Sequence, residues 1–148
     1  MYIGDIDDAM ELQSLRSLGV KAVVNLATEQ VSKPWYSSLA GNLASANIDL
    51  LELCAQDNPT FDIISVAQRA LGFIDCILKQ PDGAVLIVCY GGVNRSGAVA
   101  AAYLVSKQTM SLCTAIELLR NARGTVLTNQ SFLVQLVRYC FDNSLPLK

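Results

Sequence analysis

The chain has 148 residues, a formal net charge of −2, no histidine and 52% hydrophobic residues. A chain of this length buries about two thirds of its unfolded surface, so we expect a single domain over residues 1–148. Scattered lysines and arginines argue against a nucleic-acid partner, and no apolar stretch is long enough to span a bilayer. We expect a soluble protein of the cytoplasm, and also of the nucleus, that does not bind membranes. Its oligomeric state is left open.

The first half of the chain alternates short apolar runs with helical patterns. In chain order, it predicts a strand at residues 1–3, a helix over 6–18, a strand at 21–26, an irregular segment over 27–47 with a short helix near 36–46, and a strand over 48–54. Residues 57–60, Asp-Asn-Pro-Thr, are typical of a loop.

The second half is mostly helical. It predicts a helix over residues 61–79, a buried strand at 84–88, and helices over 95–107, 111–122 and 129–142. Alternating strands and helices followed by a helical tail indicate an α/β fold with a central, mostly parallel, twisted sheet flanked by helices.

Cysteine and histidine usage narrows the possible chemistry. The five cysteines are an odd number without a close CxxC pair, so neither a disulfide framework nor a zinc site is indicated. We expect most of them to be buried thiols that act as small hydrophobic residues. Without histidine, a Cys-His or Ser-His-Asp arrangement is excluded. A reactive cysteine here would need a thiolate that is stabilised by something other than imidazole.

One segment, residues 89–96, carries a cysteine and an arginine between a predicted buried strand and a predicted helix. Ligands of open α/β sheets bind at the carboxyl ends of strands. The glycines and the helix start predict a nest of inward-turned N–H groups that binds a phosphate, and Arg95 adds a fork for two oxygens. The predicted phosphate-binding residues are Tyr90, Gly91, Gly92, Val93, Asn94 and Arg95.

The same positive field would stabilise a thiolate at Cys89, because a helix start and a nearby cation lower the pKa of a cysteine. Ser96 is near enough in sequence to donate a hydrogen bond to that sulfur. Attack on phosphorus also needs a general acid for the leaving oxygen. Asp57, in the predicted loop, is the candidate, whereas Asp62 is explained equally well by capping of the helix that follows.

The spacing of Cys89, Arg95 and Ser96 resembles the C-x5-R-S phosphate loop of cysteine-dependent protein tyrosine phosphatases. Nearly the whole chain resembles the small dual-specificity members of this superfamily, including Asp57 at 32 residues before Cys89. The resemblance implies that fold and a catalytic set of Cys89, Arg95, Asp57 and Ser96. It also implies a cysteinyl-phosphate intermediate and a phosphorylated protein as partner, with neither a cofactor nor a metal.

Two residues depart from the family pattern. Val88 stands where the family usually has a histidine that organises the loop, so we expect a higher pKa of Cys89 and slower turnover. Thr128 stands where proline often precedes Asn129, and here we expect an effect on the helix start alone. Two alternatives stay open: a phosphoprotein-binding module with little turnover, and a phosphatase for a non-protein ester.

Overall fold

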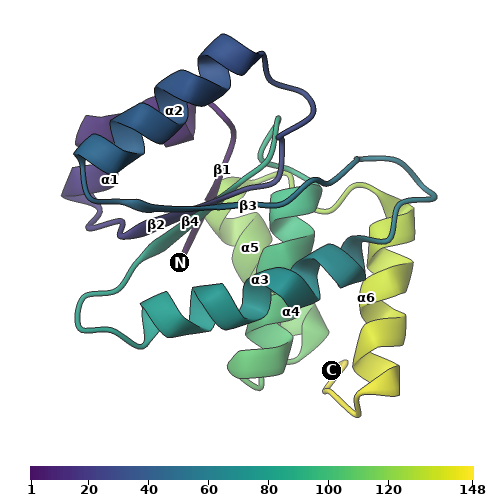
Figure 1. The fold of residues 1–148 in the computed structure, drawn as a ribbon. Coiled ribbons are helices and arrows are strands. Elements are labelled where there is room, and N and C mark those ends of the chain that lie inside the picture. The colour runs from purple at the N-terminus through teal and green to yellow at the C-terminus, as the bar shows by residue number, and fades with distance from the viewer.

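The computed structural model describes residues 1–148 and has a four-stranded sheet at its centre (Figure 1). The strand order is β1-β4-β2-β3, and every neighbouring pair is parallel. The strands are β1 Tyr2–Gly4, β2 Ala22–Asn25, β3 Asp49–Glu52 and β4 Val85–Val88. All residues of β2 and β4 are buried, which explains their continuous apolar sequences. The predicted α/β class is confirmed, and the sheet is wholly parallel.

Helices cover both faces of the sheet (Figure 1). On one face lie the 3-10 turn η1 Asp8–Met10 and the helices α1 Leu12–Ser17 and α2 Lys33–Ser45. On the other lie α3 Ile63–Leu78, α4 Arg95–Lys107, α5 Leu112–Arg123 and α6 Gln130–Asp142. The larger core cluster of 31 residues forms around α3 and α4, and the smaller, of nine, lies under α1 and α2. None of the helices is long and apolar enough to cross a membrane.

Two predicted elements in the first half were wrong in detail. The helix expected over residues 6–18 is broken at Glu11, which separates η1 from α1. The carboxylate of Asp5 accepts the backbone N–H groups of Asp7 and Asp8, and this local turn competes with a helix. By contrast, α2 is longer than predicted, because the Ser32 hydroxyl caps it and Pro34 lies in its first turn, where no N–H is needed.

The prediction that most cysteines are buried was also wrong. Cys89 and Cys140 are buried, whereas Cys54, Cys76 and Cys113 are exposed. Cys54 follows the edge strand β3, and the other two lie on outward faces of α3 and α5. A cysteine carries no helical or strand pattern of its own, so its small size alone did not indicate which face it occupies.

Candidate active site

The segment Cys89–Arg95 runs from the end of β4 to the first residue of α4, and we call it the phosphate loop. Its first residue, Cys89, is 1% exposed, and its backbone N–H donates to the carbonyl of Gly4 at the end of β1, at 3.3 Å. Gly92 has φ +65, a left-handed conformation that favours glycine. Gly91 does not have a positive φ, so only one of the two glycines is needed for the backbone conformation.

The thiol of Cys89 has an environment that favours its ionised form. Its Sγ lies 3.3 Å from Oγ of Ser96. Burial raises the pKa of Cys89. Hydrogen bonds from the side chain and backbone of Ser96, the charge of Arg95 and the backbone of Val93 together lower this pKa by more than burial raises it. The pKa of Cys89 therefore lies below its ordinary value, without any contribution from imidazole.

Arg95 is the first residue of α4 and is 3% exposed. Its Nη1 donates to the carbonyl of Ala55 at 3.1 Å and to that of Leu26 at 3.4 Å, just beyond the ends of β3 and β2. Its Nε is buried and has no hydrogen-bond partner. A buried, unpaired guanidinium donor beside a thiol fits a site that receives an oxyanion.

Asp57 is held next to the phosphate loop by two amides. Its Oδ2 accepts from Nδ2 of Asn94, and its Oδ1 accepts from Nδ2 of Asn129, both at 2.9 Å. The rival carboxylate, Asp62, accepts the backbone N–H of Ser65 and caps α3. The structure therefore brings Asp57 to the loop that carries Cys89 and gives Asp62 the capping role.

Asn94 and Asn129, which hold Asp57, were not predicted as its partners. Asn94 was expected to contribute its backbone to phosphate binding, yet its side chain links three segments: Nδ2 donates to Asp57, and Oδ1 accepts from the backbones of Thr128 and Asn129 at 2.7 and 2.9 Å. These partners lie at least 34 residues from Asn94 in sequence, and no local pattern could have indicated them.

Thr128 also has a role that we did not expect. Both its backbone N–H and its hydroxyl donate to Oδ1 of Asn94. A proline at this position would have no N–H for that bond. The expectation that this departure affects the start of α6 alone was therefore wrong, because Thr128 also contacts the phosphate loop.

Val88 is fully buried and packs in the smaller cluster, under α1 and α2. Its partner in the neighbouring strand is Asn25, which is also fully buried. Oδ1 of Asn25 accepts the N–H of Ala27, but Nδ2 has no partner. A buried donor thus lies beside the position where the family usually has an imidazole.

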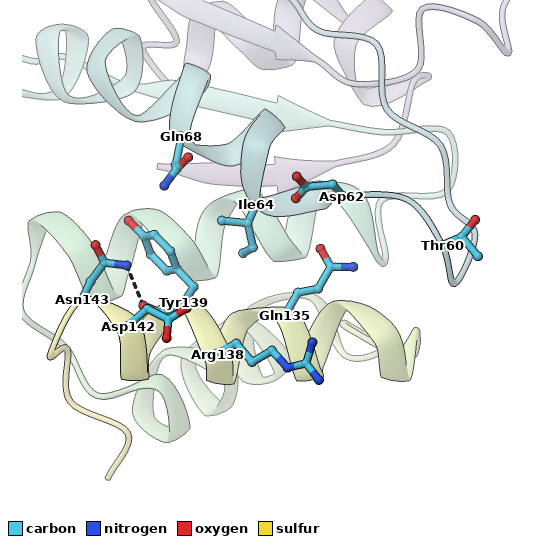
Figure 2. Close-up of a pocket in the computed structure, with 9 residues that line it drawn as sticks. All are labelled: Thr60, Asp62, Ile64, Gln68, Gln135, Arg138, Tyr139, Asp142 and Asn143. Atoms are coloured by element: carbon cyan, nitrogen blue, oxygen red, sulfur yellow. Dashed lines mark hydrogen bonds between the residues drawn. The ribbon is translucent and has the colours of Figure 1, made fainter.

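The open spaces of the molecule are only partly related to this site. A cavity of about 380 Å³ lies between α3 and α6, and its lining residues include none of the predicted site residues (Figure 2). Another, of about 340 Å³, is lined by Asp57 together with Glu29, Gln30 and Asn58. The acid candidate therefore stands at the edge of an open hollow, whereas Cys89 is enclosed.

Comparisons with known proteins identify the family of the chain. The family model described as "Dual specificity phosphatase, catalytic domain" matches residues 1–141. Human dual specificity protein phosphatase 26 is 34% identical over 137 residues, which cover 93% of this chain and 62% of the relative. Human dual specificity protein phosphatase 2 is 28% identical, over 94% of this chain and 41% of the relative. The chain thus spans less than two thirds of these relatives.

Solved structures share the fold. The crystal structure of human DUSP28 matches with a TM-score of 0.82 and 23% identity, over 96% of this chain and 88% of that one. The human tyrosine phosphatase-like serine/threonine/tyrosine-interacting protein matches with a TM-score of 0.76 and 22% identity, over 96% and 91%.

Proposed function

Because the chain belongs to the dual specificity phosphatase family, we propose that it is a protein phosphatase that hydrolyses phosphotyrosine and also phosphoserine or phosphothreonine. Cys89 is the nucleophile, Arg95 and the backbone of residues 90–95 bind the phosphate oxygens, Asp57 is the general acid, and Ser96 assists the sulfur. The observation that supports this most is the meeting of three groups at one loop: a thiol whose pKa is lowered, an unpaired buried guanidinium donor and an anchored carboxyl group.

In the first step, the thiolate of Cys89 attacks phosphorus while the bond from phosphorus to the leaving oxygen breaks. Asp57 gives its proton to that oxygen, so the product leaves as a neutral alcohol or phenol. Arg95 and the loop N–H groups stabilise the equatorial oxygens of the transition state. Both oxygens of Asp57 accept amide N–H groups in the structure, so the oxygen that carries the proton is also in contact with Asn94 or Asn129.

In the second step, water attacks the cysteinyl phosphate. Asp57, now a carboxylate, takes a proton from the water, and the bond between sulfur and phosphorus breaks to give inorganic phosphate. The Ser96 hydroxyl, 3.3 Å from the sulfur, donates a hydrogen bond to the departing thiolate. The residues present therefore complete a balanced cycle that regenerates Cys89.

The test is hydrolysis of a small aryl phosphate across pH by the wild type, Cys89→Ser and Asp57→Asn, followed by phosphopeptides that carry each of the three phosphoresidues. We expect the rate to rise with pH as Cys89 ionises, and the rise to come at lower pH than for an ordinary thiol because the pKa of Cys89 is lowered. Cys89→Ser should be inactive, and Asp57→Asn should lose about 10²- to 10⁴-fold in rate on phosphates whose leaving oxygen needs a proton, such as phosphoserine and alkyl phosphates. Wild-type turnover no faster than that of Cys89→Ser would contradict the proposal.

A phosphoprotein-binding module is the second candidate, and Val88 is the observation that favours it. A fully buried valine, next to an unpaired amide of Asn25, occupies the place of the usual imidazole. The two functions separate in one experiment: the binding module holds phosphopeptides with no release of phosphate, whereas the enzyme releases phosphate over many turnovers. Hydrolysis of aryl phosphate with none of the phosphopeptides cleaved would instead indicate a non-protein ester as substrate.

A further inference from the structure

Arg123, the last residue of α5, connects this helix to the amino-terminal turn of the chain through a pair of carboxylates. Its Nη2 lies 2.9 Å from Oδ2 of Asp5, and its Nη1 lies 3.0 Å from Oδ2 of Asp8. The same oxygen of Asp8 accepts the backbone N–H of Asp5, so the turn between β1 and η1 is closed as well. We call Asp5, Asp8 and Arg123 the carboxylate–arginine clamp.

The clamp lies directly against the middle of the phosphate loop. A Cβ added at Gly92 would lie 2.7 Å from Nη2 of Arg123, 2.8 Å from the carbonyl carbon of Gly4 and 2.9 Å from the backbone nitrogen of Asp5. These separations leave room only for hydrogen. Gly92 therefore packs on the guanidinium and on the backbone at the end of β1, in its left-handed conformation.

The position of Gly92 decides where the neighbouring loop N–H groups point. The loop is tied at its start by the bond from Cys89 to Gly4 and near its end by the bond from the N–H of Leu127 to the carbonyl of Val93. Between these two ties, the contact of Gly92 with the clamp supports the turn. Misplacement of catalytic groups by about 1 Å can cost about 10²-fold in rate, so a small shift of this turn would matter.

We propose that Arg123 is a positioning residue of the phosphate loop. It holds the turn of residues 5–8 against Gly92 and neutralises part of the negative charge of Asp5 and Asp8 beside the bound phosphate. This inference rests on the proposed function. The side chains of Arg123, Asp5 and Asp8 are 30%, 34% and 45% exposed, and ion pairs at such sites contribute little to folding stability. Its effect should therefore be larger on phosphate binding and turnover than on unfolding.

The test compares Arg123→Met and Arg123→Lys with Arg120→Met. Arg120 is exposed, one turn earlier on α5, and makes none of the three salt bridges, which makes it a matched control. Calorimetry measures the binding of inorganic phosphate, and steady-state kinetics with an aryl phosphate give kcat and KM. Alkylation across pH gives the pKa of Cys89, and thermal melting gives the unfolding midpoint.

We expect Arg123→Met to weaken phosphate binding about tenfold and to lower kcat by about 10²-fold, as a displaced loop would. The alkylation pKa of Cys89 should rise and the unfolding midpoint should change little. Arg123→Lys keeps the charge but not the two-armed geometry, so its values should fall between those of the wild type and Arg123→Met.

Phosphate binding and kcat of Arg123→Met indistinguishable from those of Arg120→Met would overturn the inference. If Arg123→Met does not fold, Arg123→Lys is judged by the same comparison. If the wild type binds phosphate but shows no turnover, the proposed function fails, while calorimetry alone still decides whether Arg123 positions the loop.

Discussion

Cys89 is surrounded by groups that favour its thiolate, and none of them is an imidazole. Burial opposes ionisation, so the lowered pKa depends on Ser96, Arg95 and the loop backbone together. These groups follow one another along a short stretch of chain, and this is why the sequence predicted their chemistry. Asn25, whose amide Nδ2 is unpaired, lies beside Val88 only because β2 pairs with β4. This proximity could not be predicted in the same way.

Replacing Val88 with histidine should lower the pKa of Cys89 further. The new imidazole would lie next to Nδ2 of Asn25, which has no acceptor and can donate to the neutral ring, while the protonated fraction of the ring would favour the thiolate of the adjacent Cys89. Because Val88 is fully buried, the larger ring should also cost about 1–3 kcal/mol in the free energy of unfolding. The alkylation rate of Cys89 across pH measures the first effect, and urea unfolding the second.

The control for this change is Val88→Leu, which adds volume without an imidazole. It should lose a similar amount of stability while the pKa of Cys89 stays at the wild-type value. Equal pKa values of Cys89 in Val88→His and the wild type would remove our explanation of how the missing histidine affects the thiol.

At the scale of elements, the site depends on three loops that converge: the phosphate loop, the loop that carries Asp57, and the connection from α5 to α6. Asn94 and Asn129 join all three through Asp57. Asn129 has a second task, because its Oδ1 accepts the N–H of Ser131 and caps α6. A substitution can separate these two tasks, since serine is also a good cap.

Asn129→Ser should keep α6 capped and remove one of the two amides that hold Asp57. We expect the unfolding midpoint to stay close to that of the wild type, whereas kcat for alkyl phosphates should fall about tenfold because the acid is less well placed. Aryl phosphates with strongly acidic leaving groups need no proton and should be hydrolysed almost as fast as by the wild type. Equal losses for both substrate classes would show that Asn129 does not act through Asp57.

Helix α4 is buried from Arg95 to Val105, and this close packing predicts that Gly97 cannot be enlarged without cost. A Cβ at Gly97 would lie 2.5 Å from Cγ1 of Val126, whereas one at Gly72 of α3 would have no atom within 4 Å. Gly97→Ala should therefore destabilise the fold by about 1–3 kcal/mol, because it overpacks the core. Gly72→Ala should instead stabilise it by about 0.5–1 kcal/mol through helix propensity. Urea unfolding of both variants measures these opposite signs.

Long helices were predicted to within two residues at each end, as α3, α4 and α6 show. The errors fell in the first half, where hydrogen bonds from side chains decide the outcome. The Asp5 carboxylate replaces helical bonds with a turn, and the Ser32 hydroxyl starts α2 ahead of Pro34. Apolar periodicity does not carry this information, because the residues that decide it are polar and local.

Over the whole molecule, the clamp connects the first turn of the chain to the end of α5, more than a hundred residues later. The sequence contains no sign of such a pairing, since all three residues are common on protein surfaces. The phosphate loop therefore depends on both the amino-terminal turn and the helical half of the fold.

This connection makes the acid stability of the fold depend on Asp5. Burial raises the pKa of Asp5, but the backbone N–H of Asp8, the guanidinium of Arg123 and the backbone N–H of Asp7 lower it, so it ends below its ordinary value. The folded state therefore takes up this proton at lower pH than the unfolded state. The resulting stabilisation is complete above the unfolded pKa of about 4 and is lost as pH falls through the lower folded value.

We expect Asp5→Asn to be less stable than the wild type at about pH 6, by no more than about 1 kcal/mol because the pair is partly exposed. The difference between the two proteins should shrink as pH falls below about 4, since protonation of Asp5 in the wild type removes the same charge. Urea unfolding at a series of pH values measures the difference. Glu11→Gln, an exposed acid in the same segment that forms no salt bridge, is the control and should follow the wild type. A difference between Asp5→Asn and the wild type that stays constant with pH would show that the charge of Asp5 does not stabilise the clamp.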